Sequence, residues 1–367
     1  MPLKTLGKYE LIEELGRGGF GTVWRARDTS LDVERAVKVL HPALATSPEF
    51  IERFRREGRF AARLEHPHIV PVYELGEADG HYYLSMKYLP GGSLKDLLAR
   101  QGALPFAQAV EITRQVAEAL TYAHQQPEKL IHRDLKPGNI LFERLPGEGI
   151  KAAVRLSDFG FAKALAEAGG SSSSASGGML GTPAYMAPEV WRGKTASPAA
   201  DQYALACVLC EMLTGQTLFT GDTPPEIMTK HVLDGPHFPA AWPEGVPAEI
   251  ANVLRRALAA KPEERYPDVG AFSAACVALL APKLVVETRP EPPAETPPAR
   301  LHPSSTQVKP VVGLPRSGPA QSNTQPTPKT PSPVLLPWHT VAWIAFGWAV
   351  GGVTLSFVLF FCFAVIK

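Results

Sequence analysis

The sequence has few cysteines and almost no net charge. Only 4 of its 367 residues are Cys, and 37 Lys plus Arg residues balance 36 Asp plus Glu residues. So few cysteines exclude a disulfide framework and fit a reducing compartment. The net charge of +1 supplies no overall field that would attract nucleic acid. We therefore expect no nucleic-acid partner, and other partners have to be inferred from local sites.

Two of the cysteines, Cys207 and Cys210, form a C-x-x-C pattern inside the apolar run YALACVLCEML. The pattern alone leaves a redox or metal site open. Residues three apart share one face of a helix, however, and most neighbours here are apolar. We expect both thiols to pack in a core.

Charge is also missing from residues 340–366, a run of 27 apolar or uncharged residues. As a helix this run would be about 40 Å long, more than a bilayer's hydrocarbon core of about 30 Å. Before it, residues 281–337 hold 15 of the 36 prolines. We expect a disordered linker over 281–337 and a transmembrane helix over 338–366; a buried core helix is the alternative.

The remaining sequence predicts an α+β protein of two lobes, after a tail over residues 1–8. Residues 9–90 alternate apolar and polar positions around glycines, which predicts antiparallel strands with one helix at 50–64. Three strands are expected between 9 and 40, and two more at 69–77 and 81–89. Residues 91–280 change to long helical patterns, so the second lobe should be mostly helical.

A glycine-rich segment, GRGGFGTV, lies between two predicted strands at residues 16–23. Gly16, Gly18 and Gly21 would let backbone amides approach phosphate oxygens without any Cβ in the way. An ordinary hairpin is the alternative. Lys38, seventeen residues after Gly21, lies in the predicted strand AVKVL. Glu57 in the following helix could pair with its ammonium group, because a partly buried lysine needs a counter-charge.

Two further segments supply carboxylates, an amide and an ammonium group: IHRDLKPGNILF at 131–142 and SDFG at 157–160. Asp134, Lys136, Asn139 and Asp158 are the groups that phosphoryl transfer needs, because metal ions, a positioned hydroxyl and charge neutralisation provide most of its rate. Either segment alone could be an ordinary polar loop. Their joint occurrence in this order favours a catalytic site.

These motifs resemble the protein kinase family, and specifically the bacterial membrane-anchored Ser/Thr kinases, over about residues 7–280. The resemblance implies a two-lobed kinase domain at 9–280, divided at residue 90. It implies transfer of the γ-phosphate of ATP to Ser and Thr hydroxyls of proteins, with Mg²⁺, or Mn²⁺ as an alternative. The ATP site would consist of Leu15, Gly16, Arg17, Gly18, Gly19, Phe20, Gly21, Val23, Ala36, Lys38, Met86, Lys87, Leu89 and Leu141.

The same resemblance implies a role for each catalytic residue. Lys38 would contact the α and β phosphates and pair with Glu57. Asp134 would accept the proton of the substrate hydroxyl, while Lys136 would steady the γ-phosphate. The metal ligands would be Asn139 and Asp158.

Other matches are structural in the family. GTPAYMAPE at 181–189 is similar to the substrate-binding loop of Ser/Thr kinases, in which Thr182 would bond Asp134 and Lys136. Glu189 would pair with Arg265, and Asp201 would hold the catalytic loop from beneath. One departure is Lys87, at a position where the family usually has Glu; adenine would still be read by the backbone there.

The resemblance also suggests regulation. Arg133 resembles the arginine of kinases that a loop phosphate activates, and a Ser-rich stretch (Ser171, Ser172, Ser173, Ser174 and Ser176) could carry that phosphate by autophosphorylation. A flexible insert without regulation is the alternative. Gly347 and Gly351 form a G-x-x-x-G pattern that could support a homodimer in the membrane.

The expected location is the cell membrane, with a single span in contact with lipid. The N-terminal residues lack the apolar core of a signal peptide. Since ATP and Mg²⁺ are cytoplasmic, the kinase domain should face the cytoplasm. Two other interpretations remain. One is a pseudokinase scaffold, which would have no need of all five of Lys38, Glu57, Asp134, Asn139 and Asp158. The other is a Pro-rich arm that serves as a ligand for polyproline-binding domains.

Overall fold

The computed structural model describes residues 4–19, 21–127, 129–144, 153–159 and 183–281. All of them lie in the first of two compact units, Met1–Thr288. The predicted membrane helix and, except for residue 281, the predicted linker lie outside these residues. Within the ranges described, no helix has both the length and the hydropathy needed to cross a bilayer.

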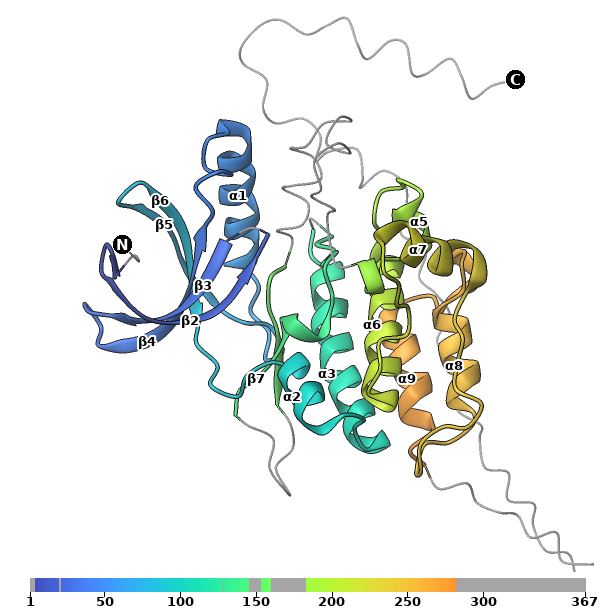
Figure 1. Cartoon of the computed structure of the whole chain (residues 1–367). Helices are drawn as coiled ribbons and strands as arrows, with labels where there is room; N and C mark the ends of the chain where they lie inside the picture. Colours follow the sequence, from blue (N-terminus) through green and yellow to red (C-terminus); the bar gives the residue numbers. More distant parts are fainter. Residues whose placement is uncertain (1–3, 20, 128, 145–152, 160–182, 282–367) are drawn as a thin grey trace, which may run out of the picture. The chain divides into compact units, whose positions relative to one another are not determined.

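The N-terminal lobe is built on one antiparallel sheet, shown in Figure 1 beside α1. The strand order is β1-β2-β3-β4-β6-β5. The three strands predicted between residues 9 and 40, and the two predicted after the helix, are confirmed. The strands are β1 (Thr5–Leu6), β2 (Tyr9–Gly18), β3 (Gly21–Asp28), β4 (Val33–Leu40), β5 (Val72–Ala78) and β6 (His81–Lys87).

Helix α1 (Pro48–Ala61) packs against one face of this sheet. It begins after Ser47, whose side chain accepts a hydrogen bond from the Phe50 backbone N–H at 3.3 Å, and a proline at the first turn fits because no N–H partner is lost there. Phe50 and Phe54 are buried in the core between helix and sheet.

Strand β4 separates two small apolar cores. Ala36 and Leu40 belong to the core under α1, whereas Val37 and Val39 belong to the core on the opposite face. Because successive side chains alternate along a strand, Lys38 lies on the α1 side of the sheet.

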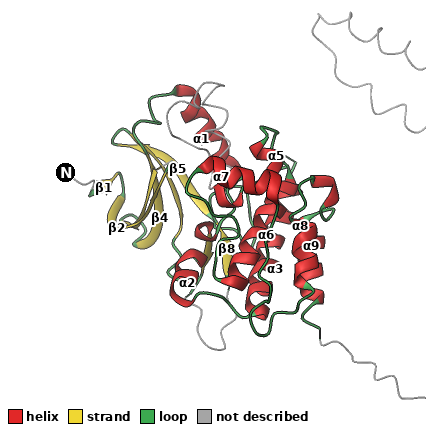
Figure 2. Ribbon diagram, turned by 45° about the vertical axis from the view of Figure 1, so that its right-hand side comes forward, coloured by secondary structure: helices red, strands yellow, loops and turns green. Residues whose placement is uncertain are grey.

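The second lobe is mostly helical, as predicted, and its helices surround α6 (Figure 2). α6 is buried on nearly all sides, so it lacks the polar face of a surface helix. Cys207 and Cys210 lie in its buried part, and burial raises the pKa of the Cys210 thiol to about 12. The prediction of core thiols is confirmed. The α-helices are α2 (Leu94–Gln101), α3 (Phe106–His124), α5 (Pro188–Trp191), α6 (Pro198–Thr214), α7 (Pro224–Thr229), α8 (Ile250–Ala257) and α9 (Val269–Ala278).

Shorter elements connect these helices. They are the 3₁₀ turns η1 (Pro137–Asn139), η3 (Pro183–Tyr185) and η5 (Pro262–Glu264), the π-helical turn η4 (Lys230–Asp234), and the strands β7 (Ile140–Phe142) and β8 (Val154–Leu156).

Strand β8 pairs with a neighbour on each side. β7 is antiparallel to it, and residues 68–70, from the connection between α1 and β5, run parallel to it. The Leu156 N–H donates to the His68 carbonyl at 2.9 Å, and the Val70 N–H donates to the Leu156 carbonyl at 3.0 Å. A segment of the first lobe is therefore tied to the strand that leads into Asp158.

Candidate active site

The glycine-rich segment is a hairpin, in which Gly18 is paired with Gly21. Phe20, at its tip, lies outside the described residues. A Cβ on Gly21 would lie 2.0 Å from the Val39 carbonyl oxygen, so this glycine is required by the close approach of β4. A Cβ on Gly16, Gly18 or Gly19 would meet no described atom within 4 Å. Packing explains Gly21 but not the other three.

A histidine that the sequence analysis missed meets this hairpin. His41 Nε2 lies 2.9 Å from the Gly18 carbonyl oxygen. His41 directly follows β4, and no motif marks it, because the contact depends on how the two strands pair. It fixes one side of the hairpin close to its tip.

Residues predicted to surround adenine gather in a single apolar cluster. Three of them are buried and the other two pack against them. Leu15, at the edge of this region, is 43% exposed. The residues of the cluster are Val23, Ala36, Met86, Leu89 and Leu141.

An apolar pocket lies next to this cluster, between α1, the sheet and β8. Ala61, Leu84 and Met86 line one part of it, and Asp158 and Phe159 line another. The pocket therefore connects the apolar cluster of the first lobe with the SDFG segment of the second.

Lys38 and Asp158 meet across the two lobes. Lys38 is 5% exposed, and its Nζ lies 2.8 Å from Asp158 Oδ1. Burial would raise the pKa of the Asp158 carboxyl, but the Lys38 ammonium outweighs burial and holds that pKa below its usual value. Asp158 has a φ of 63°, a left-handed conformation that is uncommon for a residue with a side chain.

Glu57 is buried in the same region, at 3% exposure on α1. Its Oε1 lies 3.5 Å from Arg56 Nη2. The predicted pair between Glu57 and Lys38 stays a prediction.

The loop after residue 131 brings the other predicted catalytic groups together. Lys136 Nζ donates to Asp134 Oδ2 at 2.6 Å, and Asn139 Nδ2 donates to the Asp134 carbonyl at 2.7 Å. Because the amide nitrogen of Asn139 is used in this way, its Oδ1 is the atom that could bind a cation. No group of three or more His, Cys, Asp or Glu suited to a metal is present among the described residues.

Asp201 supports this loop from the start of α6, as predicted. Its carboxylate accepts the backbone N–H groups of His132 and Arg133 at 2.8 and 2.9 Å. His124, which the sequence analysis missed, has its Nε2 at 2.7 Å from Asp201 Oδ2. Burial would raise the pKa of Asp201, but the hydrogen bond and charge of His124, together with His132 and the Arg133 N–H, lower this pKa below its usual value.

Arg133 and His132 are fixed by this support. Arg133 has a φ of 69°, and its Nε is buried without a hydrogen-bond partner within the part of the chain that the structure describes. His132 Nε2 lies 2.8 Å from the Ser157 carbonyl oxygen, and its ring is 4.8 Å from that of Phe159. The loop and the SDFG segment are thus joined through His132.

The predicted pair of Glu189 and Arg265 is confirmed. Arg265 donates to both carboxylate oxygens of Glu189, at 2.7 and 2.8 Å, and both side chains are buried. This two-pronged geometry is the strong form of the ion pair. It attaches α5, which includes the last two residues of the predicted substrate-binding loop, to the end of the second lobe. Thr182 of that loop lies outside the described residues.

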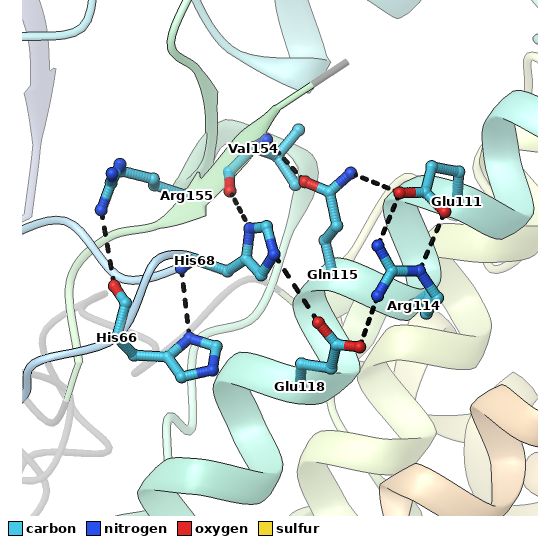
Figure 3. A network of polar contacts seen from close by, with 8 residues as sticks. All are labelled: His66, His68, Glu111, Arg114, Gln115, Glu118, Val154 and Arg155. Atoms are coloured by element: carbon cyan, nitrogen blue, oxygen red, sulfur yellow. Dashed lines mark hydrogen bonds and ion pairs between the residues drawn. The ribbon is translucent and has the colours of Figure 1, made fainter. Parts of the chain in front are cut away.

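A polar network joins β8 to α3 behind the site (Figure 3). Gln115 accepts the Val154 N–H at 2.9 Å, and His68 Nδ1 lies 2.9 Å from the Val154 carbonyl. His68 Nε2 is 3.6 Å from Glu118, which also binds Arg114. Sequence reasoning missed this network because its members come from segments far apart in the chain.

Lys87, the residue that departs from the family pattern, has its own partner. Its Nζ donates to Glu143 Oε1 at 3.1 Å, and Arg155 Nε donates to the same oxygen at 2.6 Å. Arg155 also donates to the Ile69 carbonyl at 3.0 Å. Charged side chains therefore connect the end of β6 with Glu143 after β7, with β8, and with residue Ile69.

Known protein kinases are similar to this chain in sequence and in fold. A family model described as protein kinase domain matches residues 9–275. The chain is 41% identical over 263 residues to the serine/threonine-protein kinase PknB of Mycobacterium tuberculosis, a match that covers 71% of this chain and 41% of that protein.

Two more matches extend the comparison. The chain is 37% identical over 260 residues to the serine/threonine-protein kinase PrkC of Bacillus subtilis, covering 71% of this chain and 38% of that protein. It therefore spans about two fifths of the length of these relatives. The crystal structure of the Mycobacterium tuberculosis PknI kinase domain superposes with a TM-score of 0.56 at 30% identity, covering 75% of this chain and 97% of that one.

Proposed function

Because the chain belongs to the protein kinase domain family, we propose that it is a Ser/Thr protein kinase that transfers the γ-phosphate of ATP to hydroxyl groups of proteins. The observation that carries the proposal is the 2.8 Å contact between Lys38 and Asp158. It connects the strand next to the glycine hairpin with the segment next to the Asp134 loop. A scaffold that only binds partners has no use for a buried charge pair at this place.

Asp134 is the proposed acceptor of the proton from the substrate hydroxyl. Lys136 Nζ, 2.6 Å from Asp134 Oδ2, keeps the carboxylate oriented and provides positive charge where the transferred phosphoryl group carries negative charge. The bond from Asn139 to the Asp134 carbonyl holds the loop in position. The apolar cluster around Met86 would receive the adenine ring.

The metal-binding groups would be Asp158 and the Oδ1 of Asn139. The chemistry of these donors fits Mg²⁺, which takes hard oxygen ligands and is commonly held by one or two protein carboxylates together with substrate phosphates. The ion pair with the Lys38 ammonium keeps the Asp158 carboxylate charged, which is the form that binds a cation. A bound metal ion would neutralise charge on the phosphates.

The test is transfer of label from γ-labelled ATP to a generic basic protein by the purified chain. Lys38→Met, Asp134→Asn and Asp158→Asn should each lower the rate by about 100-fold or more, because each removes a group that acts on the phosphates or the hydroxyl. Glu52→Gln, an exposed exchange on α1, is the control. If the natural chain gave no labelling above that of the Asp134 variant, the pseudokinase would be the correct interpretation.

Regulation by autophosphorylation forms part of this proposal. The buried Arg133 Nε without a partner among the described residues supports it, because a phosphate would supply acceptors for the guanidinium group. The phosphorylated residues would be one or more of the serines at 171–174 and 176, which lie outside the described residues. Mass spectrometry of the active chain beside Asp134→Asn should find loop phosphate in the first sample alone.

We further propose that residues 338–366 anchor the chain in the cell membrane, with the kinase domain on the cytoplasmic side. The 27 residues without formal charge support this. Protease added outside intact cells should leave residues 1–337 uncut. Crosslinking in membranes, with Gly351→Ile as comparison, tests whether the G-x-x-x-G pattern gives a dimer; an unchanged yield would exclude that contact.

A further inference from the structure

Three charged side chains join the two lobes next to the apolar cluster predicted for adenine. Lys87 ends β6 in the first lobe, and Glu143 directly follows β7 in the second. Lys87 Nζ and Arg155 Nε both donate to Glu143 Oε1, at 3.1 and 2.6 Å. We call Lys87, Glu143 and Arg155 the interlobe clamp.

The clamp has a second anchor in the first lobe. Arg155 Nη1 donates to the Ile69 carbonyl at 3.0 Å, in the connection between α1 and β5. The side chains of Lys87, Glu143 and Arg155 are 37%, 33% and 17% exposed, so all three are largely withdrawn from solvent. Glu143 is therefore tied to the first lobe both at the end of β6 and, through Arg155, at residue 69.

The central carboxylate is charged. The hydrogen bond from Arg155, helped by the one from Lys87, holds the pKa of Glu143 below its usual value against the effect of burial. Near pH 7 an anion thus lies between two cations that would otherwise repel each other. The clamp is an ionic contact, and removal of either Lys87 or Glu143 breaks the direct tie between β6 and the end of β7.

The connection between the lobes, residues 87–92, is held separately at its other end. The Gly91 N–H donates to the Phe142 carbonyl at 3.2 Å, and the Phe142 N–H donates to the Gly92 carbonyl at 2.9 Å. A Cβ on Gly91 would lie 2.5 Å from the Phe142 carbonyl oxygen, so only glycine fits this close to β7. The connection is therefore attached beside β7 at both ends, by backbone at 91–92 and by the clamp at 87.

These two attachments enclose the apolar cluster. Met86 directly precedes Lys87, Leu89 lies between the attachments, and Leu141 lies two residues before Glu143. The other two members of the cluster lie on β3 and β4. A flat ring gains most contact where apolar side chains meet both of its faces, so the spacing between the two sides of the cluster decides how tightly the ring binds.

We propose that Lys87 and Glu143 are positioning residues for the adenine end of ATP: their ion pair holds the first-lobe side of the apolar cluster and Leu141 at the spacing that fits the ring. This rests on the proposed kinase function. The clamp acts through the apolar cluster and not on the phosphates or the acceptor hydroxyl. Lys87, where the family usually has Glu, would thus serve the nucleotide through its side chain as well as through its backbone.

The test compares three probes by titration calorimetry on the full chain with Mg²⁺: ATP, adenosine and tripolyphosphate. Lys87→Met keeps most of the apolar stem but removes the ammonium group. We expect Kd for ATP and for adenosine to rise by about two- to fivefold, the size expected for one partly exposed ion pair, while Kd for tripolyphosphate stays unchanged. Lys87→Arg, which can still donate to Glu143, should keep the natural adenosine affinity.

The matched control is Lys261→Met, which removes the ammonium group of an exposed pair with Glu264 at 2.9 Å and should change none of the three affinities. Equal losses of adenosine and tripolyphosphate affinity in Lys87→Met would mean a general structural role. An unchanged adenosine affinity would mean that the clamp does not act on the nucleotide. Either result overturns the proposal.

Salt provides a readout that a purely steric role of Lys87 would not move. Adenosine carries no charge, so the salt dependence of its Kd reports on charges of the protein. At 1 M salt the screening length is about 3 Å, so the clamp should weaken and Kd for adenosine should rise in the natural chain. The rise should be smaller in Lys87→Met. An equal salt effect in both chains would contradict the proposal.

Initial rates with a Ser-containing peptide separate this proposal from the kinase function itself. Lys87→Met should raise KM for ATP and leave kcat and the peptide KM unchanged. If the natural chain transfers no phosphate although adenosine affinity depends on Lys87 as expected, the kinase activity is rejected and the clamp stands. Normal transfer with an adenosine affinity that ignores Lys87 rejects the clamp alone.

Discussion

Single glycines in the hairpin between β2 and β3 are constrained for different reasons. The Val39 carbonyl comes so close to Gly21 that only the absence of a Cβ allows β3 and β4 to pair there. No such neighbour explains Gly18 among the described residues. The use of glycine at position 18 is therefore better explained by the close approach of a ligand than by packing within the protein.

Exchange of these two glycines should separate stability from nucleotide binding. Gly21→Ala should lower the free energy of unfolding by about 1–3 kcal/mol, because a methyl group has to displace the β4 backbone. Gly18→Ala should change it by less than about 0.5 kcal/mol and instead raise KM for ATP. Urea denaturation and initial rates measure both. A stability loss at Gly18 as large as at Gly21 would contradict this assignment.

Asp201 is another residue whose contacts predict a clear effect. Asp201→Asn should lower the free energy of unfolding by about 3 kcal/mol, because it weakens the bonds to two backbone N–H groups and to His124 in a buried place. The rate of phosphoryl transfer should fall as well, since the Asp134 loop loses its support. Asp222→Asn, at an exposed position, is the matched control and should change neither quantity.

The sequence allowed some of these residues to be predicted and not others. Asp201, Glu189 and Arg265 lie in segments whose motifs mark them, and the structure confirms their partners. His41 and His124 make equally short contacts, yet nothing in the local sequence distinguishes a histidine that contacts a carbonyl or carboxylate from a solvated one. His132 lies in the motif at 131–142, but the motif does not identify the Ser157 carbonyl as its partner. Their partners lie at least 23 residues away in the chain.

At the scale of elements, the end of β6 and the strands β7 and β8 are joined through Glu143. Lys87 and Arg155 both donate to one oxygen of this carboxylate. Without Glu143, two like charges would face each other near the connection between the lobes. Lys87, where the family usually has Glu, is thus paired with Glu143, which directly follows β7. This pairing is visible only in the folded chain.

The pKa of Glu143 gives a pH dependence. The hydrogen bond from Arg155 lowers this pKa below its usual 4.5, against the opposing effect of burial. A carboxyl with a lowered pKa stabilises the fold above its unfolded pKa and loses this contribution as pH falls through the folded value. The stability difference between the natural chain and Glu143→Gln should therefore be constant above about pH 5 and shrink below about pH 4.

Denaturation curves at several pH values check this prediction. A difference between the natural chain and Glu143→Gln that grows in acid would have the wrong sign for a lowered pKa.

The helices and strands were easier to predict from the sequence than the contacts between individual residues. The periodicities of the sequence predicted β2 to β6, α1 and a mostly helical second lobe, and the two-lobed kinase fold is confirmed. Strand β1 was missed, because it lies in the predicted tail over residues 1–8. The parallel pairing of residues 68–70 with β8 could not be predicted. The strand predicted over 69–77 begins only at Val72, and the pairing of the preceding residues depends on contacts between the lobes and not on a local pattern.

At the scale of the whole molecule, the chain is proposed to consist of a catalytic unit and a membrane anchor. A chain shortened to residues 1–281 should transfer phosphate to a generic substrate at an unchanged rate but should remain in the supernatant after membranes are sedimented. The full chain should sediment with the membranes and require detergent for release. Sedimentation of both chains alike would mean that residues 282–367 are not the anchor.

The pairing of residues 68–70 with β8 places the connection after α1 and the segment before Asp158 on a shared set of backbone hydrogen bonds. A substitution that breaks this pairing should therefore disturb both lobes at once, because the same two hydrogen bonds belong to the first lobe and to the strand that leads into Asp158.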